Sequence, residues 1–355
     1  MAMQTYTTKA SRNLIRAEAE MLKDVDEIIV LGKFGQQKEQ PLNKTDTVVF
    51  RRVMAYGGTA QTNPADGYSE TMDFTAASHV AAEGVTPPAD TITYVDVSTT
   101  LQQYVALYKF SSKVALTYED DIPADMRKQC SKRLAAVSEL IDYGQVRAGT
   151  AVVYSNGSSR SAVNTPLTLN TLRRAARALN RNQADLVSDM VDSGANFATY
   201  PVEPAFVCFI HTDMEPDVRR IEGFVHKVSY GGVYKPLHPR EFGAVENFRF
   251  ISSPYFKPFL AAGATVTGTG LLSAGAANVD VYPSIVMGAD AFGCVSLKGH
   301  GVSGINPTII PANQKNHANP AGMFGYVGAD FWKSTVRLNE NFMVRIESGA
   351  AELTD

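Results

Sequence analysis

Apolar residues recur every three or four positions in two long segments, and this spacing predicts helices. The first segment runs from Ser11 to Val30, and the second runs from Tyr118 to Gly149. The apolar positions are Leu14, Ala17, Met21, Val25 and Ile28 in the first, and Met126, Cys130, Leu134, Val137, Ile141 and Ala148 in the second. Carboxylates and Pro123 stand at the expected start of the second helix, where both are favoured. This helix should run for about 25 residues.

Strand patterns occupy most of the remaining chain. β-Branched and aromatic residues predict strands in 45–56 and 91–116. The stretch between them is rich in Gly, Pro, Thr, Ala and Asp, and a loop of this length usually signals function or disorder. Residues 203–221 predict a buried strand, a turn and a short helix, and further strands are predicted in 248–256, 278–297 and 334–349.

The segment YSNGSSRSAVNTPLTL, residues 154–169, follows the long predicted helix. Its Asn156-Gly157 pair tolerates positive φ and is typical of a tight hairpin turn. Thr168 or Asn170 can cap a helix that runs to about Asn180. The sequence therefore predicts a helix, a hairpin and a second helix, with Asn156 and Gly157 as a structural turn.

Composition excludes several classes of function. The chain has 355 residues, with 33 Lys and Arg against 36 Asp and Glu, so it lacks the basic excess of a strong duplex DNA binder. Its three cysteines are far apart and odd in number, which argues against a disulfide framework and favours folding in a reducing cytoplasm. The N-terminal segment lacks the apolar core of a signal peptide, and no run approaches about 18 apolar residues. We expect neither export by that route nor a membrane span.

No motif predicts a catalytic residue, a cofactor or a metal ion. The Gly157 segment has one glycine and no lysine, unlike a phosphate loop, and it lacks the G-x-S-x-G pattern of a nucleophile elbow. His211, Asp213 and Glu215 could bring metal ligands together, but no further ligand motif accompanies them. A strand end at His211 and a helix cap at Asp213 explain these residues more simply.

The helix predicted to run to about Asn180 is the best nucleic-acid candidate in the sequence. Its arginines surround one apolar face and are Arg173, Arg174, Arg177 and Arg181. Guanidinium groups on an exposed helix could lie over phosphates. Such faces are more often solvated or paired with carboxylates of a neighbouring subunit. The helix is therefore a candidate for intersubunit or DNA contact.

The order of these elements resembles the Hong Kong 97-type fold of tailed-phage major capsid proteins. Five segments are similar to the major head proteins of coliphage N-four-type viruses. They are GKFGQQKEQPLNKTDTVVFRR (32–52), AAEGVTPPADTIT (81–93), RAGTAVVYSNGSSRSAVNTPLTLNTLRRAARAL (147–179), NFATYPVEPAFVCFIHTDMEPDVRRIEGF (196–224) and NVDVYPSIVMGADAFG (278–293). The resemblance covers nearly the whole chain.

The resemblance implies an α+β chain with five successive parts. They are an N-terminal arm (1–44), an extended β loop (45–116), a peripheral domain with a long spine helix (117–202), an axial domain (203–297), and a return to the peripheral domain with a C-terminal strand (298–355). Residues 55–80 are longer than the family pattern at this point. No lysine, asparagine and carboxylate set for an isopeptide cross-link is identifiable.

The resemblance also implies a structural function without catalysis. Copies would assemble as pentamers and hexamers into the icosahedral head that encloses a double-stranded DNA genome. Portal, scaffold and decoration proteins would be partners, the packaged DNA would make weak non-specific contacts, and no membrane would be involved. The protein would fold in the bacterial cytoplasm and reside in the virion. Two alternatives stay open: an encapsulin-like nanocompartment shell around an enzyme cargo, and a metal-dependent hydrolase built on His211, Asp213 and Glu215.

Overall fold

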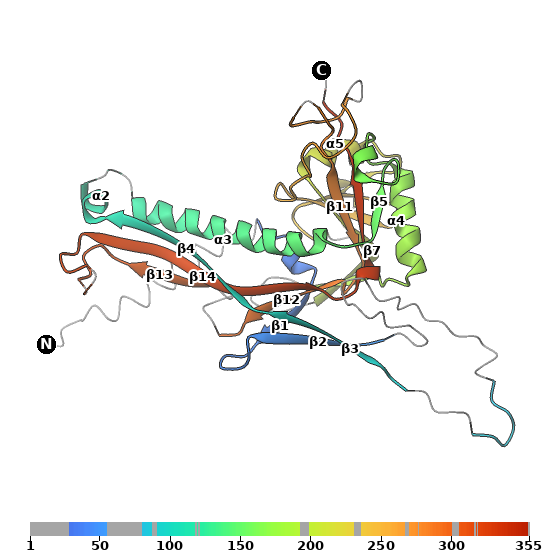
Figure 1. The fold of residues 1–355 in the computed structure, drawn as a ribbon, viewed down its shortest axis with the longest axis horizontal. Coiled ribbons are helices and arrows are strands. Elements are labelled where there is room, and N and C mark those ends of the chain that lie inside the picture. The colour runs from blue at the N-terminus through green and yellow to red at the C-terminus, as the bar shows by residue number, and fades with distance from the viewer. Residues whose placement is uncertain are drawn as a thin grey trace.

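The computed structural model shows a long, narrow layer with a more compact α/β unit at one end (Figure 1). The described residues are 28–54, 80–86, 91–117, 119, 121–191, 199–230, 236–266, 270–275, 277–299, 305–315, 317 and 319–353. The helix predicted over 11–30 lies outside this part of the chain except for its last three residues. Those three residues are not helical, and they lead into a short 3-10 helix, η1 (Leu31–Lys33).

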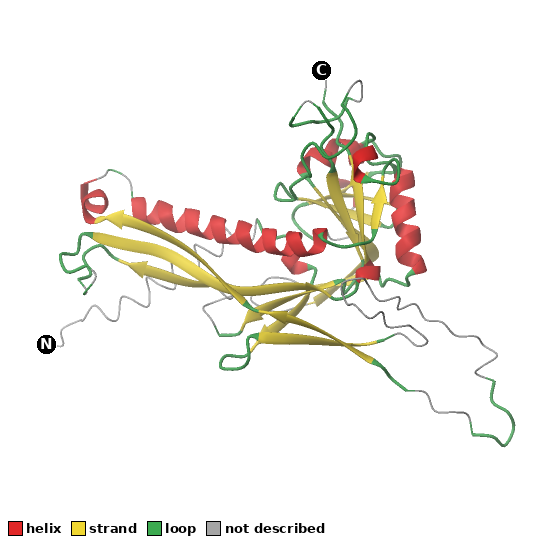
Figure 2. Cartoon of the chain, in the orientation of Figure 1, coloured by secondary structure: helices red, strands yellow, loops and turns green. Residues whose placement is uncertain are grey.

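The long layer is a five-stranded sheet with helix α3 (Ile122–Arg147) lying along one face (Figures 1 and 2). Its strands are β1 (Gln36–Gln40), β12 (Phe292–Leu297), β14 (Phe324–Arg337), β13 (Ile305–Ile310) and β4 (Gln102–Ser111). The order is β1-β12-β14-β13, and β4 pairs with the first part of β14. Cys130 and Leu134 of α3 pack against Ala106 of β4 and against Ala329 and Phe331 of β14. Among the described residues, no helix covers the opposite face (Figure 2).

Helix α3 begins and ends close to the positions predicted from the sequence. The Asp121 side chain caps its first turn by accepting a hydrogen bond from the Ala124 N–H at 3.2 Å. Pro123 lies in the first turn, where its missing N–H has no cost. The predicted long helix is therefore confirmed, within a few residues at either end.

The compact unit is built around a second, mixed sheet. Its order is β5 (Val152–Tyr154), β15 (Met343–Ser348), β11 (Tyr282–Met287), β7 (Thr199–Ile210), β10 (Phe248–Ser252), β9 (Glu241–Val245) and β8 (Val225–His226), with β6 (Val187–Val191) also on β7. Helices α4 (Leu169–Arg181) and α5 (Glu215–Arg219) share one core with this sheet. The last turns of α3 and η1 share a second core with its other face. The sheet is therefore covered on both sides.

A separate hairpin projects from the long layer. It consists of β2 (Thr47–Val53) and β3 (Tyr94–Thr100), paired antiparallel. One face packs Val48, Phe50, Val95 and Val97 against Val295 and Leu338. The other face is exposed and carries Val49, Val53 and Tyr94 around the Arg51–Asp96 ion pair. The alternation of buried and exposed positions follows the two-residue period of a strand.

Two strand predictions need correction. The stretch 91–116 forms two strands, and its last residues form a short helix, α2 (Ser112–Thr117). The stretch 334–349 contains the end of β14 and all of β15, separated by a 3-10 helix, η7 (Glu340–Phe342). These two strands belong to different sheets, which hydrophobic alternation along one segment cannot reveal.

The expected domain boundaries stay a proposal, and they divide the chain differently from the two sheets. β4 pairs with β14 over ten residues, so the end of the range 45–116 belongs to the long layer and not to the projecting hairpin. Strand β5 and helix α4, within 117–202, belong to the second sheet, and β12, within 203–297, belongs to the long one. The boundaries at 202 and 297 therefore do not separate the sheets, because each sheet draws strands from distant parts of the chain.

Candidate functional site

The Asn156-Gly157 segment forms a loop between β5 and a 3-10 helix, η4 (Arg160–Ala162). Gly157 has φ +69°, and the Asn156 Nδ2 donates to Asn164 Oδ1 at 2.7 Å. The predicted hairpin is wrong, because β5 pairs in parallel with β15 and no return strand follows the turn. A structural role for this turn stays a proposal, supported by its geometry.

We expect Gly157→Val to cost about 2 kcal/mol of stability. Positive φ is unfavourable for a β-branched residue, and a Cβ at this position would lie 2.5 Å from the Ala162 Cβ. Ser158→Ala and Ser159→Ala are matched controls on the same exposed loop and should leave the thermal melting temperature nearly unchanged. Equal melting temperatures for all three variants would refute the turn explanation.

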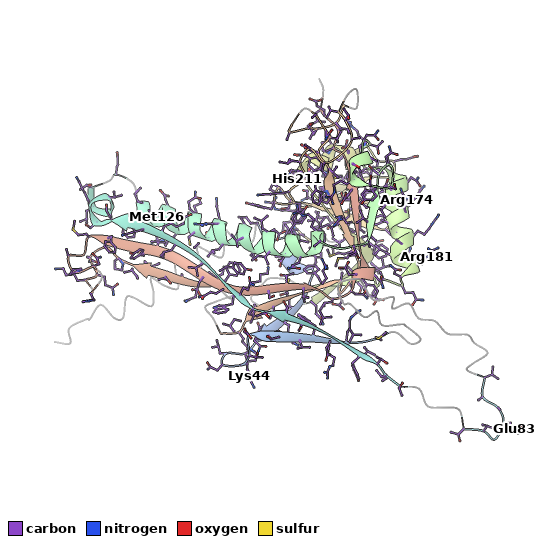
Figure 3. The ribbon with its side chains drawn as sticks, viewed as in Figure 1. Lys44, Glu83, Met126, Arg174, Arg181 and His211 are labelled. Atoms are coloured by element: carbon purple, nitrogen blue, oxygen red, sulfur yellow. The ribbon has the colours of Figure 1, made fainter. Side chains whose placement is uncertain are left out.

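Helix α4 has its apolar side in the core and its arginines outside. The Thr168 side chain caps the helix, and Leu172, Ala175 and Leu179 are buried. Figure 3 shows Arg174 and Arg181 along the exposed side of this helix. The surroundings of the arginines differ from one end of the helix to the other.

Two of the four arginines of α4 have partners within the chain. Arg173 pairs with the Glu246 carboxylate at 2.5 Å, and this pairing raises the pKa of the guanidinium. Arg174 donates to the Tyr154 carbonyl at 3.1 Å. Arg177 and Arg181 are exposed and make no hydrogen bond or ion pair with described residues. The helix is therefore only partly free to bind another molecule.

His211 and Asp213 lie in contact, with the His211 Nδ1 3.2 Å from the Asp213 carboxylate, but Glu215 does not complete a ligand set with them. The His211 ring nitrogen Nδ1 accepts from the Asp213 N–H at 3.1 Å, and Tyr282 donates to the Asp213 carboxylate at 2.9 Å. Glu215 pairs instead with Arg219 at 3.0 Å. Within the described ranges, no three His, Cys, Asp or Glu side chains are arranged to hold a metal ion. The structure thus offers the hydrolase alternative no metal site in these ranges.

A buried carboxylate on α3 anchors the segment that precedes the long layer. Glu139 is fully buried, and its carboxylate accepts hydrogen bonds from the N–H groups of Val30 and Leu31 at 3.0 and 3.1 Å. Burial raises the pKa of the Glu139 carboxyl to about 7, although these two hydrogen bonds and Lys333 oppose the shift. No motif marks this residue in the sequence, although Glu139 stands among the apolar positions of the α3 pattern.

Because the pKa of Glu139 is raised, we expect the protein to lose stability as the pH rises from about 4.5 to 7. In this window the folded protein keeps a proton that the unfolded chain has released, so the free energy of unfolding falls as pH rises. The raised pKa corresponds to a change on the order of 3 kcal/mol. Urea unfolding at several pH values should show a correspondingly smaller decrease for Glu139→Gln. Parallel pH profiles for the two proteins would contradict this assignment.

One turn further along α3, Asp142 lies at the centre of a buried polar cluster. Its carboxylate is 2.5 Å from the Lys333 Nζ and accepts a hydrogen bond from the Thr335 hydroxyl at 2.5 Å. Lys333 also donates to the Ser138 hydroxyl at 2.8 Å. Burial lowers the pKa of Lys333, but the charge of Asp142 outweighs it and the net shift is upward. This cluster fixes α3 to β14.

A second buried carboxylate connects the compact unit to the end of α3. Glu347 of β15 is fully buried and binds the Arg160 guanidinium through two contacts, at 2.8 and 2.7 Å. Arg345 donates to the same carboxylate at 2.8 Å and to the Gly149 carbonyl at 3.0 Å. The two ionic clusters thus fix the relative positions of α3 and both sheets.

The face of the long sheet opposite α3 exposes large apolar side chains. Val105 and Leu107 of β4 are 61% and 53% exposed, and strand alternation directs them away from the helix. The outer face of the β2–β3 hairpin adds Val53 and Tyr94. Clusters of exposed apolar residues often mark surfaces that contact another protein.

Other features limit the chemistry that the chain can support. Cys130, Cys208 and Cys294 are buried and unpaired, and burial raises the pKa of all three thiols. No helix in the described ranges combines the length and apolar character that a membrane span requires.

Comparison with known proteins identifies the fold. No protein-family model and no curated protein matches the sequence. Among solved structures, the capsid of Ralstonia phage GP4 matches with a TM-score of 0.62 at 12% identity, over 92% of this chain and 90% of that chain. The acid-stable capsid of Helicobacter pylori bacteriophage KHP30 gives 0.55 at 11% identity over 91% and 89%, and the cyanophage Pam1 capsid gives 0.54 at 12% over 92% of each chain.

These matches define the chain as an α+β protein with the fold of phage capsid proteins. This is the Hong Kong 97-type fold that the resemblance in the sequence implied, so the prediction of fold class is confirmed.

Proposed function

We propose that this chain is the major capsid protein of a tailed phage, whose copies form the icosahedral head around double-stranded DNA. The observation that carries the proposal is the likeness to the Ralstonia phage GP4 capsid over 92% of this chain. The role is structural, since shell formation requires complementary surfaces and no catalytic group. The closer similarity to N-four-type head proteins rests on the five sequence segments given above.

The exposed faces of the chain support self-assembly. A single subunit leaves Val105 and Leu107 uncovered on the long sheet, and Val53 and Tyr94 uncovered on the hairpin. Contacts repeated at every position of a closed shell add up, so each can be weak. The hairpin is suited to act as the extended loop, α3 as the spine helix, and the second sheet as the core of the axial domain.

The proposal includes the location and partners of the protein. Copies would form pentamers and hexamers within the virion, after folding in the bacterial cytoplasm. Portal and scaffold proteins, and decoration proteins in some heads, would assist assembly. The packaged genome would contact the inner surface through weak, non-specific ionic interactions.

The nanocompartment alternative is less favoured, because the similar structures named above are phage capsids. The neighbouring genes distinguish the two. Portal and terminase genes beside this gene would support the phage head. A cargo enzyme in their place would support the nanocompartment.

Charged substitutions on the uncovered sheet face should abolish assembly without unfolding the subunit. In Val105→Glu/Leu107→Glu, both side chains are exposed in the subunit, so its melting temperature should stay close to that of the wild type. Electron microscopy and sedimentation should then show subunits or capsomers and no closed shells. Val105→Ile/Leu107→Met keeps the face apolar and should assemble normally. Normal shells from the glutamate variant would exclude this face from assembly.

A further inference from the structure

Beyond its first turn, the solvent-exposed side of α3 carries only positive charge. Between Met126 and Arg147, the basic residues are all at least partly exposed, and they are Arg127, Lys128, Lys132, Arg133 and Arg147. The only acidic residues in this stretch are Glu139 and Asp142, and both are fully buried. Arg147 donates to the Lys257 carbonyl at 3.3 Å, and the Arg127 Nε is buried. We call the other three side chains, Lys128, Lys132 and Arg133, the α3 basic face.

The α3 basic face lacks the internal partners that α4 has. In the described part of the chain, the side chains of Lys128, Lys132 and Arg133 form no hydrogen bond or ion pair. Lys128 and Lys132 lie one turn apart, where like charges destabilise a helix. An arrangement that is unfavourable in the subunit alone is suited to an anionic partner.

The α3 basic face and the exposed apolar side chains of β4 lie on opposite faces of the long sheet. Helix α3 lies on one face of the long sheet (Figure 2). Strand alternation around the buried Ala106 directs the exposed Val105 and Leu107 to the opposite face. In Figure 3, Met126 lies near the start of this helix, far from the arginines of α4. The acidic residues Asp121 and Asp125 are confined to the first turn of the helix and its cap.

We infer that the α3 basic face binds the phosphate backbone of packaged duplex DNA and lines the inside of the shell. The inference rests on the proposed function and adds to it the orientation of the subunit and the surface that meets the genome. The chain as a whole has a formal charge of −3, so a local basic surface is needed to attract DNA to one side. Weak phosphate contacts repeated in every subunit would then hold the outer layer of DNA.

Matched charge removal on the two helices tests the DNA contact. Lys128→Gln/Lys132→Gln/Arg133→Gln and Arg174→Gln/Arg177→Gln/Arg181→Gln each remove three positive charges from exposed helix positions. Binding of the full-length, unassembled protein to a duplex DNA fragment is measured at several salt concentrations. The negative slope of log K against log salt should become shallower by about 2.7 in the α3 variant. This is about 0.9 for each phosphate that the variant no longer neutralises. The α4 variant should keep the wild-type slope. Equal decreases in both variants, or a larger decrease in the α4 variant, would overturn the inference.

A labelling experiment tests the orientation in assembled shells. Lys132→Cys adds one exposed thiol to a chain whose three native cysteines are buried. A maleimide on a polymer too large to enter the shell should modify unassembled subunits and fail to modify closed shells, whereas a small maleimide should modify both.

The outcomes separate this inference from the proposed function. Closed shells that react with the large reagent would place α3 outside. Shells that resist both reagents would show that another subunit covers the helix. Either result overturns the inference and leaves the capsid function intact. If no shells form under any condition, both proposals fail.

Discussion

Asp142→Ala should lower the free energy of unfolding by about 3 to 5 kcal/mol, because it leaves a buried ammonium group without its counter-ion. Lys333 is only 12% exposed, and its Nζ lies 2.5 Å from the Asp142 carboxylate. The substitution also removes the acceptor of the Thr335 hydroxyl at 2.5 Å. Urea unfolding of the full-length, unassembled subunit measures the change.

A double-mutant cycle separates the ion pair from general damage to the core. Lys333→Met alone should also be strongly destabilising, since it leaves a buried carboxylate unpaired. The double variant Asp142→Ala/Lys333→Met should lose less than the sum of the single variants, by about 1 to 3 kcal/mol. Additive losses would show that the two side chains do not depend on each other.

Glu347→Ala should be comparably destabilising, at about 3 to 5 kcal/mol. The carboxylate is fully buried and binds two guanidinium groups, those of Arg160 and Arg345. Arg345 is only 12% exposed, so its charge cannot be solvated once the partner is removed. Because Glu347 lies in the second sheet and Arg345 also binds the Gly149 carbonyl after α3, the substitution should loosen the junction of the two sheets.

The Arg51–Asp96 pair on the hairpin is a matched control for Glu347. It has the same two-contact geometry, with both distances 2.7 Å, but its side chains are 65% and 43% exposed. Water already solvates both charges, so Arg51→Ala should leave the unfolding midpoint close to that of the wild type. Similar losses of stability at Arg51 and Glu347 would contradict the claim that burial makes the Glu347 cluster important.

Local sequence patterns predicted the helices α3 and α4, because apolar spacing and helix-end residues along one short segment determine them. The apolar spacing, the carboxylates at the expected start and Pro123 were sufficient for α3, and a cap at Thr168 or Asn170 was sufficient for α4, where the structure has Thr168 as the cap. Positive φ at Gly157 also follows from local chemistry, but the expected hairpin does not form. The partner of β5 is β15, which lies almost two hundred residues away and leaves no local trace.

Contacts between distant segments were not predictable from one sequence. Periodicity identified a strand over β4 but missed most of β14, since the predicted strand 334–349 overlaps only its end. It also could not show that β4 and β14 pair in one sheet while β15 joins the other. The α3 basic face was missed for a related reason. The sequence of α3 holds five basic and three acidic residues, and beyond the first turn the charge that reaches solvent is all basic because Glu139 and Asp142 are buried. Arginine density directed attention to α4 instead.

The most direct test of the capsid assignment is electron microscopy of the purified full-length protein under assembly conditions. The account predicts closed, hollow particles with pentamers at fivefold positions and hexamers between them, with α3 on the inner side of each subunit. A folded protein that remains a monomer or a single small oligomer at every concentration, with or without a scaffold protein, would contradict it.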